Sequence, residues 1–167
     1  MKPAFRMEPL RDGHDRTAFS CGEPALDRYF QTQATQDIRR RVATCFVAVE
    51  SETGSVAAYY TLASASIPLT SLPESITRKL PRYPSLPAVR IGRLAVDLRF
   101  RGRKVGSAML ADALQRVVAS GPATYAFLVD AKDDSAAAFY RHHGFSPLQG
   151  LQLTLFLPVA TALKASI

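Results

Sequence analysis

The spacing of apolar residues predicts a helix and then a hairpin in the first part of the chain. Within residues 24–41 the apolar positions recur at steps of four, at Leu26, Phe30, Ala34 and Ile38. This spacing places them on one face of an amphipathic helix that begins at Pro24. Residues 42–49 alternate and are β-branched, a turn follows at Glu52-Thr53-Gly54, and residues 55–67 read as a second long strand. They predict an antiparallel pair of strands. Residues 1–19 predict an extended segment.

The second half of the chain alternates apolar runs with helical patterns. Compact apolar runs at 91–96 and 125–131, and alternation at 151–157, predict three further strands. Helical spacing at 105–118 and a capped segment at 135–143 predict helices between them.

Residues 68–87 form a proline-rich connector that predicts a short helix at 74–80. The strand-helix-strand units predict parallel strand pairs in the second half, and the hairpin predicts antiparallel pairing in the first half. We therefore expect an α/β fold, with one mixed sheet flanked by helices, as a single domain over residues 1–167.

Composition excludes several classes of protein. Hydrophobic residues make up 47% and charged residues 21% of the 167 positions, as in ordinary globular proteins. No apolar run approaches the roughly 20 residues that a membrane-spanning helix needs. The N-terminus lacks the apolar core of a secretory signal, which predicts a cytoplasmic protein. Cys21 and Cys45 have no metal-ligand spacing and the three histidines form no cluster, so no metal is expected. Two buried thiols are favoured over a disulfide, which stays open.

Positive charge is concentrated in one segment. The net charge of the chain is +7, and residues 78–104 alone contain nine basic residues and one acidic residue, Asp97. A surplus of this size favours a polyanionic ligand such as nucleic acid, although a solvated basic face is the commoner explanation of such clusters. The candidate nucleic-acid-binding residues are Arg39, Arg40, Arg78, Lys79, Arg82 and Arg90.

A basic, glycine-containing loop joins the strand at 91–96 to the helix at 105–118. Its residues are Arg101, Gly102, Arg103, Lys104, Val105, Gly106 and Ser107. The first turn of a helix has four N–H groups without internal partners, and the helix dipole adds partial positive charge there. Such a loop can bind phosphate or pyrophosphate. Neither the P-loop pattern nor the dinucleotide fingerprint is present.

This loop resembles motif A of the GNAT N-acetyltransferase superfamily, usually Arg/Gln-x-x-Gly-x-Gly/Ala. The resemblance implies a GNAT fold and backbone amides of residues 101–107 that hold the pyrophosphate of acetyl-CoA, the co-substrate. It also implies amides near Leu94, Ala95 and Val96 that polarise the thioester. Lys104 stands where the family usually has its first glycine. An ordinary φ at Lys104 is expected to leave its amide available.

Residues 136–145 carry a second GNAT-like signature, Phe139-Tyr140-x-x-x-Gly144-Phe145. The resemblance implies that Tyr140 is the catalytic general acid, which protonates the thiolate as it leaves. A thiol with a pKa of about 8.5 and a phenol near 10 are close enough for proton transfer. Asp133 and Ser135 stand where the family contacts CoA. Glu50, Glu52 and Asp97 are unsupported as general bases. An α-amine, with a pKa of about 7.7–8.0, needs a base less than a lysine does.

Further motifs narrow the resemblance to the acetyltransferase toxins of type II toxin–antitoxin systems. These motifs are Phe19-x-Cys21-Gly22-Glu23-x-x-Leu26-Asp27, Tyr59-Tyr60-Thr61-Leu62, Gly92-Arg93-Leu94-Ala95-Val96-Asp97, Phe139-Tyr140-x-His142-x-Gly144-Phe145 and Leu155-Phe156-Leu157-Pro158. The resemblance implies acetylation of the α-amino group on aminoacyl-tRNA, which blocks translation. It also implies a homodimer and a small ribbon-helix-helix antitoxin as partner.

Two other functions stay open from the sequence. One is a GNAT enzyme that acetylates a small amine, such as a polyamine, or a protein N-terminus. The other is a non-enzymatic basic module that binds nucleic acid, which would not bind acetyl-CoA.

Overall fold

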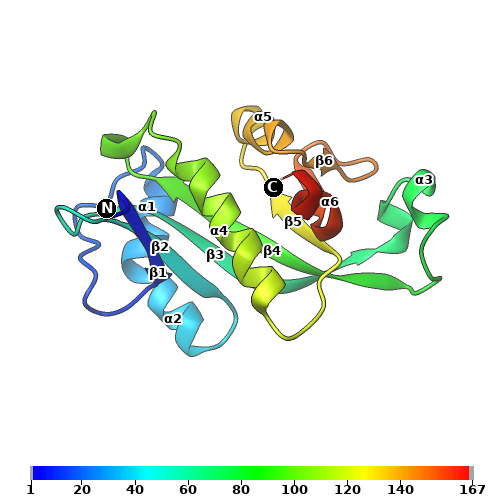
Figure 1. Cartoon of the computed structure of the whole chain (residues 1–167), viewed down its shortest axis with the longest axis horizontal. Coiled ribbons are helices and arrows are strands. Elements are labelled where there is room, and N and C mark those ends of the chain that lie inside the picture. Colours follow the sequence, from blue (N-terminus) through cyan, green and yellow to red (C-terminus); the bar gives the residue numbers. More distant parts are fainter. Residues whose placement is uncertain (1, 166–167) are drawn as a thin grey trace. The chain divides into compact units, whose positions relative to one another are not determined.

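The structure is a computed structural model that describes residues 2–165. Its elements, drawn in Figure 1, are β1 (Phe5–Pro9), α1 (Pro24–Thr32), α2 (Ala34–Arg39), β2 (Thr44–Glu50), β3 (Val56–Pro68), η1 (Leu69–Ser71), α3 (Glu74–Thr77), β4 (Ser85–Val96), η2 (Leu98–Phe100), α4 (Val105–Ala119), β5 (Ala126–Asp130), α5 (Asp134–His142), β6 (Ser146–Pro147), β7 (Thr154–Pro158) and α6 (Val159–Ala165). Within the described residues, no helix combines the length and the apolar character needed to cross a membrane.

The strands form a mixed sheet with the order β1-β2-β3-β4-β5-β7-β6. β2 pairs with β1 and β3 in antiparallel fashion, which confirms the predicted hairpin. β4 and β5 are parallel, with Val89 opposite Phe127. The α/β class with a mixed sheet is therefore confirmed.

The prediction of parallel pairing throughout the second half was wrong for the last strand. β7 is antiparallel to β5, with Leu128 opposite Phe156. The chain leaves α5 into the short strand β6, and β6 pairs antiparallel with β7. β6, the strand that follows α5, therefore runs in the same direction as β5, and β7 lies between β5 and β6 in the sheet.

The chain divides into two compact units. The first unit comprises the described chain up to Ala63 together with Gly92–Ala113, and the second comprises Ser64–Ile91 and the described chain from Leu114 onward. In the first unit an aromatic core forms around Tyr59, whose ring stacks on Phe30 at 4.3 Å between centroids and 4° between planes. In the second unit Ile67, Leu128 and Phe156 belong to a separate apolar core. The expectation of a single domain over residues 1–167 stays a prediction.

Several element boundaries differ from the prediction because tertiary pairing decides them. The helix predicted over 24–41 is divided into α1 and α2 at Gln33. Backbone hydrogen bonds still run across this position, because the Gln33 amide donates to the Tyr29 carbonyl and the Gln33 carbonyl accepts from the Asp37 amide. Residues 5–9 form a strand because β2 pairs with them along their whole length. β4 begins at Ser85, six residues before the predicted start, and β6 and α6 were not predicted. Cys21 and Cys45 are free and buried, as favoured from the sequence.

Candidate active site

Asp97 fixes the path of the chain where β4 ends. Its side chain accepts hydrogen bonds from the Arg99 amide at 2.9 Å and the Ser20 amide at 3.1 Å, and it pairs with the Arg99 guanidinium at 3.0 Å. Asp97 is 1% exposed. Burial raises the pKa of Asp97, whereas the hydrogen bonds from Arg99 and Ser20 lower it. The lowering is the larger effect, so the pKa lies below its usual value. These bonds begin η2 and direct the chain into the loop before α4.

The loop before α4 contains two residues in the left-handed region. Gly102 has φ +78°, and Lys104 has φ +59°. A Cβ added at Gly102 would meet nothing within 4 Å, so glycine is needed there for its conformation and not for space. Lys104 therefore does not have the ordinary φ under which its amide was expected to serve. A left-handed lysine costs roughly 1–2 kcal/mol relative to glycine, because Cβ crowds the following carbonyl.

The amide groups of this loop are available to a ligand. Within the described residues, the N–H groups from Gly102 to Gly106 donate no backbone hydrogen bond, and the Ala108 amide donates to the Lys104 carbonyl at 3.1 Å. Consecutive free N–H groups at a helix start attract an anion, because they add to the positive end of the helix dipole. This part of the predicted pyrophosphate site is therefore chemically suited to that role.

The arginine side chains of the loop bind to the protein itself. Arg101 donates to the Cys21 carbonyl at 3.0 Å. Arg103 pairs with Glu50 at 3.3 Å and lies over the Phe5 ring, 4.9 Å from its centroid. Both guanidinium groups therefore anchor the loop to the rest of the first unit, whereas the exposed Lys104 side chain makes neither an ion pair nor a hydrogen bond in the described chain.

The end of β4 supplies the residues predicted to meet the thioester. Ala95 is buried in the aromatic core, whereas Leu94 and Val96 are half-buried. The amide just before them, that of Arg93, donates to the Thr61 hydroxyl at 3.0 Å. A Cβ on Gly92 would lie 2.9 Å from the same hydroxyl, so only glycine allows this close approach.

Tyr140 lies in the second unit, near the end of α5. Its carbonyl accepts from the amides of His143 and Phe145, and Gly144 adopts φ +96°, which confirms the predicted left-handed helix end. The Tyr140 ring is 6% exposed and packs edge-on against Phe139 and Phe145. Burial raises the pKa of its phenol well above the usual value. Tyr140 therefore stays protonated at neutral pH.

The hydroxyl of Tyr140 is open although its ring is buried. It makes no hydrogen bond in the described chain. No fully buried side-chain oxygen among the described residues lacks a partner, so the hydroxyl oxygen must be accessible to solvent. A rigid ring with a free, protonated hydroxyl is suited to donate a proton to a ligand.

Asp133 and Ser135 lie at the start of α5, and both are exposed. The Asp133 carboxylate caps the helix, accepting from the Ala136 amide at 2.8 Å. One of its oxygens is therefore already used by the protein.

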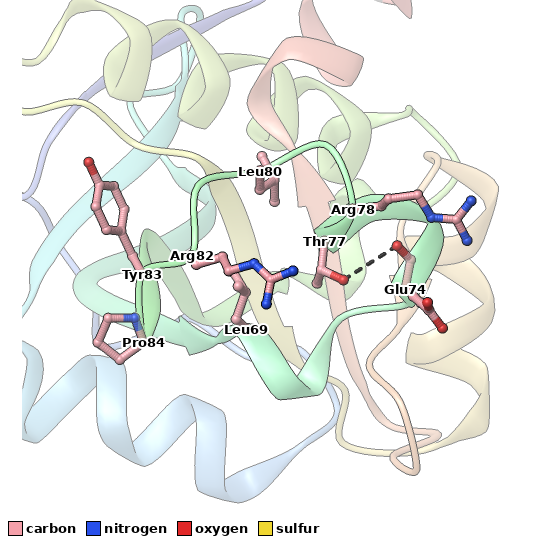
Figure 2. A pocket seen from close by; sticks show the side chains of 8 residues that line it. All are labelled: Leu69, Glu74, Thr77, Arg78, Leu80, Arg82, Tyr83 and Pro84. Atoms are coloured by element: carbon pink, nitrogen blue, oxygen red, sulfur yellow. Dashed lines mark hydrogen bonds between the residues drawn. The ribbon is translucent and has the colours of Figure 1, made fainter.

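The basic connector is exposed and free of ion pairs. Arg78, Lys79 and Arg82 have no carboxylate partner in the part of the chain that the structure describes. Arg78 and Arg82 help to line a cavity of about 570 Å³ on the connector (Figure 2). Figure 2 shows the Arg82 side chain pointing toward Thr77, while Arg78 points away. The ring of Tyr83 beside them is 61% exposed.

The other candidate RNA-binding residues differ from one another. Arg39 and Arg40 are exposed at the end of α2 and have no ion pair within the described chain. Arg90 is half-buried and pairs with Asp130, which also accepts from the Thr154 hydroxyl. Arg90 is therefore already partly neutralised.

Two of the three carboxylates considered as a general base are already used by the protein. Asp97 is buried and hydrogen-bonded, and Glu50 is paired with Arg103. Glu52 is exposed on the turn between β2 and β3. Over residues 2–165, no group of three or more His, Cys, Asp and Glu side chains is placed to hold a metal ion.

Sequence reasoning placed Arg93 in the basic segment and in the Gly92–Asp97 motif but gave it no function of its own. Its guanidinium carbon lies 3.5 Å from the centroid of the Tyr29 ring. No local pattern indicates this contact, because Tyr29 and Arg93 lie far apart in the chain.

The chain is similar to known acetyltransferases. The profile of one family, described as an acetyltransferase (GNAT) domain, matches residues 41–147. A tRNA-acetylating toxin of Mycobacterium tuberculosis is 38% identical over 158 residues, covering 92% of this chain and 93% of the toxin.

Two solved structures are similar over almost the whole chain. AtaT complexed with acetyl-methionyl-tRNAfMet has a TM-score of 0.85 and 28% identity, covering 96% of this chain and 98% of AtaT. An AtaT mutant toxin bound to the C-terminus of the antitoxin AtaR and to acetyl-CoA has a TM-score of 0.78 and 25% identity, covering 99% and 100% of the two chains.

Proposed function

The chain belongs to the GNAT acetyltransferase family, and on that premise we propose that it is a toxin that acetylates the α-amino group of aminoacyl-tRNA. The acetylated amine can no longer attack in peptide bond formation, so translation stops. The similarity to a tRNA-acetylating toxin over 92% of the chain is the observation that carries the choice of substrate.

Acetyl-CoA is the proposed acetyl donor. The free amides from Gly102 to Gly106, with Arg101 and Ser107 at either side, bind its pyrophosphate. The backbone of Leu94, Ala95 and Val96 polarises the thioester carbonyl. Asp133 and Ser135 contact the CoA moiety at the start of α5. Lys104 adds a positive charge beside the pyrophosphate.

The proposed reaction is direct transfer from the thioester to the amine. The neutral α-amine attacks the carbonyl carbon, the new N–C bond forms, and the C–S bond breaks. Tyr140 gives its proton to the departing sulfur, and the nitrogen loses a proton to solvent. The free hydroxyl and the raised pKa of Tyr140 support its role as the acid. An α-amine is partly neutral at pH 7, so its attack depends less on a carboxylate base than the attack of a lysine would.

The exposed cations form the proposed tRNA-binding surface. Arg78, Lys79 and Arg82 on the connector and Arg39 and Arg40 after α2 are unpaired in the described chain, so they are available to phosphates. Arg90 contributes less, because Asp130 already binds it.

The proposed partners follow those of the relatives. An AtaT structure contains the C-terminus of an antitoxin. By analogy, we expect a small ribbon-helix-helix antitoxin to neutralise this protein, which acts as a homodimer. Because aminoacyl-tRNA is its substrate, its place of action is the cytoplasm.

The decisive experiment is incubation with radiolabelled acetyl-CoA and total aminoacyl-tRNA, followed by sequencing of the labelled RNA. We expect label on the aminoacyl group of particular tRNAs and none on deacylated tRNA. Label on a polyamine or on a protein N-terminus, with none on tRNA, would assign a different acceptor. Failure to bind acetyl-CoA in a calorimetric titration would exclude the enzyme altogether.

A further inference from the structure

Arg93 holds an unusual position in the first compact unit. It lies in β4, directly before the residues assigned to the thioester. Its guanidinium carbon is 3.5 Å from the centroid of the Tyr29 ring in α1, which is van der Waals contact with the ring face. The side chain is half-buried.

The Tyr29 ring is itself held rigidly. It is 5% exposed, and its hydroxyl donates to the Asp37 carboxylate at 2.7 Å. The Tyr29 ring also stacks with the Tyr59 ring, at 6.4 Å between centroids and 22° between planes. A guanidinium that rests on such a ring loses little freedom when it binds a ligand.

The charge of Arg93 has no counter-ion within the described chain. No carboxylate there lies within 4.0 Å of it, and its guanidinium N–H groups donate no hydrogen bond. Asp37 binds the hydroxyl of the Tyr29 ring and forms no ion pair with Arg93. Cation–π contact uses the face of a guanidinium and leaves its N–H edge free, and that edge matches two oxygens of a phosphate.

The ligand can be named from the chemistry of the substrate. In aminoacyl-tRNA the reactive amine is carried by an ester on the terminal ribose. The first anion along the RNA from that amine is the phosphate joining the terminal nucleotide to the one before it. Arg93 adjoins the strand residues assigned to the thioester, where that amine must arrive.

We propose that Arg93, held on Tyr29, binds this terminal internucleotide phosphate and so positions the amine for attack. This inference rests on the proposed function and adds a substrate-binding residue to it. The pyrophosphate of acetyl-CoA is a separate anion, assigned to the loop before α4.

The test uses two minimal acceptors that differ by this phosphate. One is an aminoacyl ester of adenosine, and the other is the same ester of the dinucleotide CpA. We expect the wild type to have a kcat/KM about ten- to a hundredfold higher for the CpA ester, as for a charge-assisted hydrogen bond. Arg93→Gln is expected to reduce the ratio of the two kcat/KM values to about one, whatever its effect on the adenosine ester itself. Arg93→Lys keeps part of the preference.

A matched control separates substrate binding from general damage. Arg28 is exposed on α1 beside Tyr29 and has no ion pair in the described chain, so Arg28→Gln is expected to keep the wild-type preference. If Arg93 only supports the fold, Arg93→Gln slows both esters equally. Equal wild-type rates for the two esters, or an unchanged preference in Arg93→Gln, would overturn the inference.

If the protein does not acetylate aminoacyl-tRNA, the result differs from that expected if only the inference about Arg93 is wrong. In that case neither ester is acetylated although acetyl-CoA binds. Titration of unesterified CpA and adenosine against the wild type and Arg93→Gln then decides the inference without turnover. Tighter binding of CpA that is lost in Arg93→Gln supports it, and equal binding overturns it.

Discussion

The carboxylate of Asp97 accepts a hydrogen bond from the backbone amide of Ser20, 77 residues earlier in the chain, at 3.1 Å. The Leu98 amide donates to the Ser20 carbonyl at 2.9 Å, so two bonds hold the segment before α1 against the start of η2. A buried carboxylate thereby joins the aromatic core to the loop that precedes α4.

Replacing Asp97 should destabilise the protein. Asp97→Ala leaves the Ser20 amide without its partner and removes the ion pair with Arg99, and we expect a loss of about 2–3 kcal/mol in the free energy of unfolding. Urea denaturation measures it. Glu52→Ala, at an exposed carboxylate on a turn, is the control and should change stability by less than about 0.5 kcal/mol. Equal effects of the two substitutions would disprove the structural role of Asp97.

Acid should unfold the protein through the same group. The pKa of Asp97 is lowered on balance, and a hydrogen bond with His14 lowers the pKa of Glu8. The folded state therefore binds fewer protons than the unfolded state, so this stability is fully present above the ordinary carboxyl pKa values of about 4 and is lost as the pH falls below them. Urea midpoints measured from pH 6 to pH 3 should decrease below about pH 4. A smaller decrease is expected in Asp97→Asn.

Tyr140→Phe should abolish most turnover while leaving acetyl-CoA binding intact, because only the free hydroxyl is removed and the buried ring remains. We expect a loss of about 10²–10⁴-fold in kcat, the range for general acid catalysis. Burial raises the pKa of Tyr140, so the wild-type rate should show no alkaline loss from this group up to about pH 10. Tyr125→Phe, at a half-buried tyrosine before β5, is the control for phenol removal. Full activity in Tyr140→Phe would remove this residue from the mechanism.

Gly102→Ala should weaken acetyl-CoA binding. Alanine has room at this position but disfavours φ +78°, so the loop loses roughly 1–2 kcal/mol of stability in its ligand-ready conformation. Calorimetric titration should show a Kd about five- to thirtyfold higher. Gly121→Ala also has open space around its Cβ and lies outside the left-handed region, so it should bind like the wild type. Equal affinities of the two variants would show that this loop conformation is not needed.

Binding of tRNA should depend strongly on salt, because phosphate contacts release counter-ions. Each phosphate contact contributes about 0.7–0.9 to the slope of log Kd against log salt. Joint replacement of Arg78, Lys79 and Arg82 by Gln should therefore reduce the slope by about 2–3. Titrations between 50 and 200 mM salt measure it, with Arg28→Gln as the control. A slope that is flat in the wild type would contradict a basic RNA-binding surface.

Local patterns were sufficient for most elements of this fold. Helical spacing at 105–118 and the glycine at 144 located α4 and the end of α5 to within a residue or two, because both features are properties of neighbouring residues. They were insufficient for the bounds of β1 and for the direction of β7. β1 exists because β2 pairs with it, and β7 runs antiparallel to β5 because β6 precedes it.

The amino-acid sequence by itself determined the kind of chemistry: a glycine-containing loop before a helix, a tyrosine before a left-handed glycine, and a concentration of positive charge. Such features depend on residue type and short spacing. Only the tertiary structure decided which charges are free. It pairs Arg90 with Asp130 and Arg103 with Glu50, and it leaves Arg93 on the Tyr29 ring without a counter-ion in the described chain. Ion pairing depends on distances between residues far apart in the chain, which periodicity cannot encode.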